Sequence, residues 1–395
     1  MKKFLLILSV FALFSASLFA TSARIDGLGF GGAAWMVQDQ YLAYKYFPQM
    51  VSDYNNSAVL EAGAGTFGYV DLSALNGVVG ILANTPSASV IANNLNNIGA
   101  IYSMGKFGFG VTYGMENVKT LQGAITGNSE GSYTSNHEYD IGIMAGYTLN
   151  LKKNTPLDIG LNVNIPSNYN QDNETIVNGV TTAINQTGTT GLEANLDAKL
   201  TMQNDMLANI NVEFIQATEL ILAKTFTNAG VLTTHTEDST ATTTINLQLG
   251  GAKIVKIGIV NLYLGVQPNL SLANSLESNK NKMNGTNLAN NGNTASDTTL
   301  SIPLYAGVEG KINDTWTIRG GVNKSVWSMY STTTVIKNAA GNTISNINTT
   351  TNTIISDAPA VALGLSGTFG DVTLDTVIST GNTFLSQIAL TYAWK

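Results

Sequence analysis

The sequence predicts an all-β chain that forms a transmembrane antiparallel up-and-down β-barrel of about 14 strands, with a range of roughly 12 to 16. Three observations predict it. Apolar and polar residues alternate along many segments, these segments are long for globular strands, and short and long connections follow one another in turn. Only 11% of the residues are charged, against roughly 25% in soluble domains. That low share fits a chain whose outer surface meets lipid.

The first 20 residues have the pattern of a secretory signal peptide. Two lysines precede an uncharged run from Phe4 to Phe19, and Ala20 is the small residue at the predicted cleavage site, with cleavage after Ala23 as the alternative. The run is shorter than the roughly 20 residues that a spanning helix prefers, which disfavours a retained membrane anchor. We therefore expect residues 1–20 to be removed after export from the cytoplasm.

Residues 21–56 do not alternate, and we expect them to form either a plug in the barrel or a periplasmic segment. A glycine-rich stretch from Gly27 to Gly32 leads into a stretch rich in aromatic residues. Here the chain resembles the long-chain fatty-acid transporter family of the outer membrane, whose members have 14 strands and an amino-terminal plug. In that family the glycines lead to acidic residues and an Asn-Pro-Ala turn, whereas this sequence has one acid and Phe47-Pro48-Gln49. The resemblance implies that the plug includes Asp39, Tyr41, Tyr44, Phe47 and Pro48.

The barrel itself is predicted for residues 57–395. Alternation is strict from Leu192 to Met202, and it resumes from Met206 to Phe214 after three turn-forming residues, which predicts a hairpin. These segments run for about 9 to 13 residues, longer than the 5 to 6 residues common in globular strands and long enough to cross a bilayer at a tilt. The same alternation occurs at Phe107 to Met115, Tyr139 to Leu149, Leu157 to Ile165, Ile245 to Leu249, Thr299 to Glu309, Val361 to Phe369 and Val372 to Ile378.

The connections between these segments are of two kinds, which is typical of a barrel with brief turns on one side of the membrane and long loops on the other. Short turns are expected near Gly105, Asn154, Asn204, Asn313 and Gly370. Long loops are expected at Asn117 to Gly131, Pro166 to Thr189, Thr227 to Ser239, Ala273 to Thr298 and Ser331 to Ser356. Because the long connections are rich in Asn and Thr, we expect them to be mobile and solvated.

The last segment carries aromatic residues at membrane-interface spacing. Phe384 and Trp394 share one face and are ten residues apart, which corresponds to roughly 23 Å along the normal of a tilted strand, close to the roughly 25 Å apolar band. The segment resembles the terminal strand of bacterial outer-membrane proteins, although Lys395 follows the final aromatic residue. This resemblance implies recognition by the barrel-assembly machinery. The predicted interface aromatics are Phe384, Tyr392, Trp394 and Trp316.

The polar faces are predicted to line the lumen, because a lysine facing the lipid midplane costs about 2 to 4 kcal/mol. The predicted pore-lining residues are Asp140, Asp158, Glu193, Asp197, Lys199, Glu213, Glu309 and Arg319. Acids outnumber bases among them, which predicts a mild preference for cations. The alternative is that these charges pair across the lumen and only satisfy one another.

Several function classes are disfavoured by composition. The chain has no cysteine and a net charge of −7, which argue against thiol chemistry and nucleic-acid binding. His137 and His235 lie in no catalytic or metal-binding motif, so we expect no enzyme activity, metal or cofactor.

We expect a bacterial outer-membrane channel for passive diffusion of small hydrophilic solutes or ions. The alternatives are a plugged uptake channel for hydrophobic compounds, as in the transporter family, and a structural or adhesive barrel without transport. The expected partners are outer-membrane lipid, the barrel-assembly machinery and the solute. The sequence leaves monomer and trimer open.

Overall fold

The computed structural model describes most of the chain from Ser22 to Trp394. The gaps are 31–32, 38–39, 55, 63–65, 87–95, 123–130, 153–154, 178–179, 228–230, 284–287, 289–290, 355–357 and 380–386. The predicted signal peptide, Asp39 and Phe384 lie outside the described residues. Among the described residues, no helix has the length and apolar character needed to cross a membrane.

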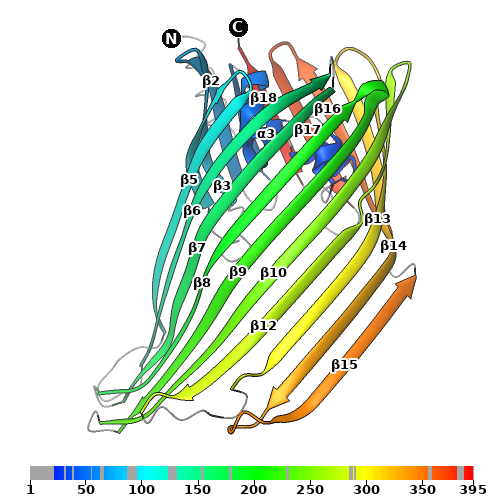
Figure 1. Cartoon of the computed structure of the whole chain (residues 1–395). Helices are drawn as coiled ribbons and strands as arrows, with labels where there is room; N and C mark the ends of the chain where they lie inside the picture. Colours follow the sequence, from blue (N-terminus) through cyan, green and yellow to red (C-terminus); the bar gives the residue numbers. More distant parts are fainter. Residues whose placement is uncertain are drawn as a thin grey trace, which may run out of the picture.

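The chain begins with short helices and continues as strands (Figure 1). The helices are α2 (Ser22–Gly27), η1 (Ala34–Met36), α3 (Gln40–Lys45) and η2 (Pro48–Tyr54), with η3 (Gln203–Asp205) at a later turn. The first strands are β1 (Ser57–Ala62), β2 (Thr66–Ala74), β3 (Gly77–Pro86), β4 (Asn96–Met104), β5 (Phe107–Gln122), β6 (Gly131–Lys152), β7 (Thr155–Val177), β8 (Val180–Met202) and β9 (Met206–Phe226). The remaining strands are β10 (Leu232–Ile257), β11 (Val260–Val266), β12 (Asn269–Asn281), β13 (Thr294–Lys311), β14 (Trp316–Lys337), β15 (Thr343–Ile354), β16 (Ala360–Phe369), β17 (Val372–Ser379) and β18 (Gln387–Ala393).

The strands form one antiparallel sheet that closes into a barrel where β1 pairs with β18, with Ser57 opposite Ala393. Two positions in the ring are shared by successive strands. β11 and β12 both pair with β10 and β13, and β15 and β16 both pair with β14. The described strands therefore make a closed barrel of 16 strands with 2 extra strands, at the upper end of the predicted range.

Three strands at the start of the barrel explain why the predicted central count of about 14 strands is lower than the observed count. The sequence of Ala58 to Leu72 on its own predicts a single strand, whereas β1 and β2 divide this stretch. β3 was not predicted at all, because Val78, Val79 and Ile81 break the alternation. On β3 the inward face is apolar, since Val78 and Leu82 are buried. A strand that is apolar on both faces carries no period-two signal.

The barrel turns its apolar residues outward. On β6, Tyr139, Ile141 and Ile143 are 41 to 45% exposed, whereas Asp140 between them is 0% exposed. The same inversion holds on β16, where Leu365 is 40% exposed and Ser366 is 4% exposed. Hydrocarbon is the solvent that stabilises such an exterior, and closure pairs the strand edges that lipid forbids. The chain is therefore an outer-membrane barrel.

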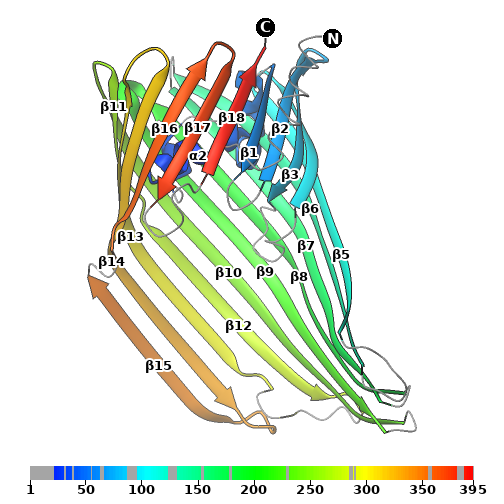
Figure 2. The same cartoon turned by 180° about the vertical axis from the view of Figure 1, so that it is seen from behind.

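Brief turns join the strands at the end of the barrel that carries both termini (Figures 1 and 2). They lie at Leu75–Asn76, Gly105–Lys106, Gly258–Ile259 and Gly370–Asp371, among others, and several have positive φ angles. Aromatic side chains gather close to these turns. The ring centroids are 5.5 Å apart for Trp316 and Phe369, 5.8 Å for Tyr392 and Trp394, and 4.6 Å for Phe107 and Tyr147.

Trp316 and Trp327 differ in parity in the sequence, which predicts either a bulge near Gly320 or an inward-facing Trp327. The structure has an irregularity elsewhere on β14, where Ile302 pairs with Trp327 and Pro303 pairs with Ser325. The extra residue opposite the proline changes the parity of β14 between the two tryptophans.

Most residues of the predicted long loops are strands, so that prediction was wrong. β7 runs to Val177, β8 begins at Val180, and β15 covers Thr343–Ile354. Threonine is a β-branched residue with high strand propensity, and each of these strands has a paired neighbour, which overrides the polar composition. The extended strands form one long side of the barrel in Figures 1 and 2, and the strands from β16 round to β4 form a short side.

Candidate functional site: a plug in the barrel lumen

Residues 22–54, here called the plug, lie inside the barrel near the end with the termini (Figures 1 and 2). η2 contacts β3, β4, β5 and β6, whereas α2 contacts β14, β16, β17 and β18. Contacts with walls on both sides of the ring place the plug in the lumen. The centre of the plug is closed to solvent, because Leu28, Phe30, Leu42 and Val51 are each 0% exposed.

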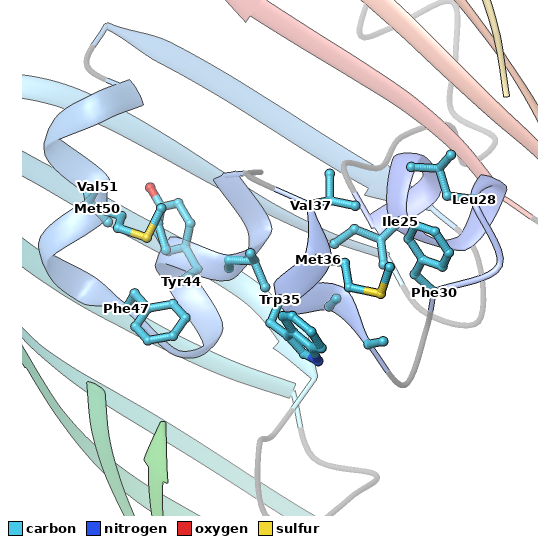
Figure 3. Close-up of a cluster of buried hydrophobic side chains, with 14 of the residues drawn as sticks. Ile25, Leu28, Phe30, Trp35, Met36, Val37, Tyr44, Phe47, Met50 and Val51 are labelled. Carbon is cyan, nitrogen blue, oxygen red and sulfur yellow. The ribbon is translucent and has the colours of Figure 1, made fainter. Parts of the chain in front are cut away.

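The plug folds around apolar residues that form one cluster with the inner wall. Figure 3 shows Tyr44, Phe47 and Met50 at one end of this cluster and Leu28 and Phe30 at the other. Inward-facing wall residues complete the cluster, and they are Val59, Tyr69, Val78, Leu82, Ile101, Met144, Leu207, Ala252, Tyr263 and Tyr305. Burial of apolar surface on both sides stabilises the docked plug.

Glycines on the inner wall allow the plug to come close. A side chain at Gly108 would overlap the backbone of Pro48 and Gln49, and one at Gly321 would overlap the carbonyl of Leu28. The same holds on further strands, where a Cβ would meet plug atoms at Gly146, Gly160, Gly250, Gly265 and Gly307. The wall is therefore shaped to hold this segment in this position.

Charged residues hold the α2 end of the plug. Arg24 donates two hydrogen bonds to Glu309 on β13, of 3.0 and 2.9 Å. Arg319 on β14 donates to the same carboxylate at 2.6 Å and also pairs with Asp375 on β17. The Tyr263 hydroxyl donates to Glu309 as well. Two arginines thus neutralise two carboxylates that belong to β13 and β17. The two hydrogen bonds from Arg24 to Glu309 fix the position of α2.

The α3–η2 end is held by hydroxyl groups. The Tyr44 hydroxyl donates to Asp71 on β2, and the Tyr44 ring lies 4.1 Å from the Tyr69 ring. The Ser103 hydroxyl on β4 donates to the carbonyl of Gln49 at 2.7 Å. Burial raises the pKa of the Tyr44 hydroxyl, and the charge of Asp71 raises it further. Tyr44 is therefore a neutral donor to that carboxylate at physiological pH.

Two plug carboxyls have shifted acidities. Burial raises the pKa of Asp26 above its usual range, and a hydrogen bond from Gln387 and the charge of Lys45 offset this only in part. Burial also raises the pKa of Asp53, and the charge of Asp158 on the wall adds to it.

The described residues that were predicted for the plug lie in α3, in η2 and in the link between them. Tyr41 and Tyr44 belong to α3, Pro48 begins η2, and Phe47 connects them and is 1% exposed. Lys45 lies 5.6 Å from the ring centre of Tyr41. The residues missed are those of the first half, above all Arg24. The only sequence signal for Arg24 was a basic residue in a stretch that otherwise holds one charged residue, Asp26.

The residues predicted to line the pore all lie on inward faces. Glu309 and Arg319 belong to the charge network of α2, and Lys199 stands opposite Asp158 in the β7–β8 register. Amides and hydroxyls donate hydrogen bonds to acids on β6 to β9, Asp158 included. Asn97 donates to Asp140, Thr148 to Asp158, Asn211 to Asp197 and Asn246 to Glu213, and Glu193 is 4% exposed. These hydrogen bonds supply no positive charge to the acids that accept them.

A cavity of about 130 Å³ lies between the middle of the plug and strands β8, β9 and β10. Its plug side is formed by Ala34, Trp35, Tyr46 and Phe47, and its wall side by Asn195, Asp197, Asn209, Asn211, Glu213 and Gln248. Trp35 is fixed by a 2.7 Å hydrogen bond from its indole nitrogen to Gln267, which in turn donates to Gln248. The cavity thus has an aromatic side and a side rich in hydrogen-bond acceptors.

Comparison with known proteins shows likeness at the level of barrels only. No family model matches the chain, and a search of curated proteins found no match. Among solved structures, the chain is similar to the translocator domain of the autotransporter NalP from Neisseria meningitidis, with 14% identity, 73% of this chain and 88% of that chain covered, and a TM-score of 0.27. It is also similar to the P. putida toluene transporter TodX, with 9% identity, coverage of 86% and 87%, and a TM-score of 0.36.

A third similar structure is the ferric yersiniabactin uptake receptor FyuA from Yersinia pestis, with 7% identity, coverage of 85% and 71%, and a TM-score of 0.39. Because every TM-score is below 0.5, none of these likenesses bears on what this barrel carries. The lipid-facing exterior and closed ring place the protein in the bacterial outer membrane.

Proposed function

We propose that this protein is a plugged outer-membrane channel that admits small hydrophilic solutes and prefers cations. The observation that carries the proposal is the docked plug. Its backbone lies against glycines on opposite walls of the barrel, at Gly108 and at Gly321. A segment held on both sides of the lumen restricts flow at that level. Passage therefore depends on movement of the plug or on a narrow path beside it.

The preference for cations rests on the inner wall between β6 and β9. Asp140, Asp197 and Glu213 accept hydrogen bonds from neutral donors, and Asp158 does so as well but also faces Lys199. Glu309 and Asp375 are instead matched by Arg24 and Arg319. One side of the lumen thus keeps a negative field that favours cations, and the other side is close to neutral.

Uptake of hydrophobic compounds is the second candidate function, because that alternative also predicts a plug in the lumen. The apolar residues of the plug, however, are used in packing against the wall. The open space beside the plug is lined on the wall side by carboxylates and amides. Such a lining favours hydrophilic solutes over hydrocarbons.

Single-channel recording in planar bilayers under a potassium chloride gradient tests the proposal. We expect low conductance from the natural protein. We also expect its reversal potential to be displaced from zero toward the equilibrium potential of potassium. Gly321→Val should displace the plug and raise the conductance, because its side chain would overlap the carbonyl of Leu28. The matched control is Gly320→Val on the neighbouring residue, whose side chain would point away from the plug toward Leu363.

Large, equal currents from the natural protein and from Gly321→Val would contradict a restricting plug. A reversal potential on the chloride side would contradict the cation preference. The absence of current from every variant would favour the structural or adhesive alternative. Heat-modifiable migration on gels checks that each variant has folded into a barrel. Arg24→Ala provides a second way to loosen the plug if Gly321→Val does not fold.

A further inference from the structure

The cavity between the plug and β8, β9 and β10 is built from ordered rows of polar side chains. In the strand register, Asn195 stands opposite Glu213, which stands opposite Asn246. One step along, Asp197 stands opposite Asn211, which stands opposite Gln248. The next row contains Lys199, Asn209 and Gly250. These three rows on β8, β9 and β10 are here called the grid. The absence of a side chain at Gly250 makes room for the ring of Trp35 beside it.

The polar groups of the grid are fixed before any ligand arrives. Asp197 and Asn211 are 7% exposed and Asn209 is 4% exposed. The Asn211 amide donates to Asn195 at 2.6 Å and to Asp197 at 2.9 Å, so its two protons are used. The buried Oδ1 of Asn209, by contrast, has no hydrogen-bond partner among the described residues. A buried acceptor without a partner costs free energy, and a donor in the cavity would recover it.

The charge of the cavity is negative. Asp197 and Glu213 line it, and no basic side chain does. Of the nearby bases, Lys199 faces Asp158 in the neighbouring register. Lys45, on the plug side, lies 5.2 Å from the ring centre of Tyr46, and its charge also acts on Asp197. The lining itself carries two carboxylates and no basic side chain, so it favours a cation over an anion.

The opposite side of the cavity is aromatic. Trp35, Tyr46 and Phe47 line it together, and the indole nitrogen of Trp35 is already bound to Gln267. The faces of such rings attract cations and also pack against short alkyl groups. The volume of about 130 Å³ is close to that of cavities that hold one benzene molecule, which are on the order of 150 Å³.

From these features we infer that the cavity is a binding site for a small organic ammonium ion, a primary ammonium group with a short apolar tail. The ammonium group donates to Asn209 Oδ1 and to the carboxylates of Asp197 and Glu213. The tail lies against Trp35 and Phe47. The inference deepens the proposed function, on which it rests, by naming a class of solute. Among the described residues, no group of three His, Asp or Glu could hold a metal ion, so the acceptors suit an organic cation.

Isothermal titration of the full chain in detergent tests the site, with n-butylammonium as the probe. 1-Butanol has nearly the same shape without the charge, and butyrate has the opposite charge. We expect butylammonium to bind and the other two to give no measurable heat. Asp197→Asn and Glu213→Gln should each weaken binding by about tenfold or more, because each removes a charge-assisted hydrogen bond.

The matched control is Glu219→Gln, which makes the same change of charge on β9 at an exposed position outside the cavity. It should leave binding unchanged. Asn209→Asp provides a variant with the opposite expectation, since a third carboxylate in place of the amide should tighten binding. This arm keeps the test informative if a loss-of-charge variant does not fold.

Equal binding of butylammonium and butanol, no binding of butylammonium, or unchanged affinity in Asp197→Asn would each overturn the inference. The outcome is separate from that of the proposed function. If butylammonium does not bind but Gly321→Val still raises the conductance and Gly320→Val does not, the plugged channel stands and only the ammonium site fails.

Discussion

The two ends of the plug are held to the barrel by different interactions. The α2 end relies on charges, with Arg24 and Arg319 sharing Glu309. The α3–η2 end relies on hydroxyl groups and on close backbone approach, as at Gly108. Charge networks respond to salt and to pH, whereas close packing does not. The comparison indicates that the α2 end is the one that conditions or a ligand could release, while the α3–η2 end serves as the fixed point.

The largest effect should come from filling the space at the fixed end. Gly108→Val would place its side chain in the backbone of Pro48 and Gln49, which cannot move without moving η2. We expect destabilisation of about 3 kcal/mol or more, at the upper end of the range for overpacking. Thermal unfolding and protease cleavage within residues 48–54 provide the measurement.

Gly251→Val is the control for this change, because a side chain there would meet nothing within 4 Å. It should behave as the natural protein does. Equal stability of Gly108→Val and Gly251→Val would show that the plug does not dock against this wall.

Removing the arginine of the α2 end should have a smaller effect. Arg24→Ala deletes two hydrogen bonds to Glu309, but Arg319 still neutralises that carboxylate. Since the Arg24 side chain is 28% exposed, we expect a loss of about 1 to 2 kcal/mol, reduced at high salt. Protease cleavage near residue 28 should increase while cleavage in η2 stays unchanged.

Arg24→Lys separates charge from geometry, because lysine keeps the charge and loses the two-pronged contact. It should fall between alanine and the natural residue. Cleavage that increases equally at both ends of the plug in Arg24→Ala would contradict the independence of the two ends.

The stability of the α2 end should also depend on pH through Asp26. Burial raises the pKa of this carboxyl, so the folded state keeps its proton at pH values where the unfolded chain has lost it. The free energy of unfolding should therefore fall as the pH rises from about 4, the usual carboxyl value, through the raised pKa, and then level off.

Asp26→Asn should remove this slope, and apparent melting temperatures measured across the pH range would show it. A slope that persists unchanged in Asp26→Asn would assign the effect to another group, such as Asp53, whose pKa is also raised.

The smallest effect should come from one neutral hydrogen bond at the fixed end. Ser103→Ala removes the donor to the carbonyl of Gln49. The expected loss is about 1 kcal/mol, seen as a lower melting temperature without a change in conductance. A clear rise in conductance would mean that this single bond holds the plug closed.

Much of the barrel was predictable, because lipid imposes one rule on every strand. The alternation around Glu193, Asp197 and Lys199 gave the inward face of β8, and these residues are buried there. The short turns near Gly105, Asn204, Asn313 and Gly370 were predicted from their glycines and asparagines, whereas those at Leu75–Asn76 and Gly258–Ile259 were not. The rule fails where a strand meets the plug, since β3 is apolar on both faces. It fails also in the parts of β7, β8 and β15 that were predicted to be loops, because their Thr- and Asn-rich composition resembles that of a loop.

The site was only partly predictable. Aromatic residues such as Tyr44 and Phe47 indicated a packed segment before the barrel, but the partners of that segment depend on the barrel's closure. Glu309 is far from Arg24 in sequence, and nothing local links them. Inward glycines were the available signal, because Gly160 and Gly307 occupy polar-face positions and leave room for another segment.

A disulfide between the plug and the wall tests the central claim most directly. The chain has no cysteine, and a Cβ on Gly27 would lie 3.3 Å from the Cα of Gly364, so cysteines at both positions are close enough to be joined. Solute uptake into liposomes would be measured for Gly27→Cys/Gly364→Cys, oxidised and then reduced. We expect uptake to stop when the plug is tethered and to return on reduction. Equal uptake in both states would contradict the claim that release of the α2 end opens the channel.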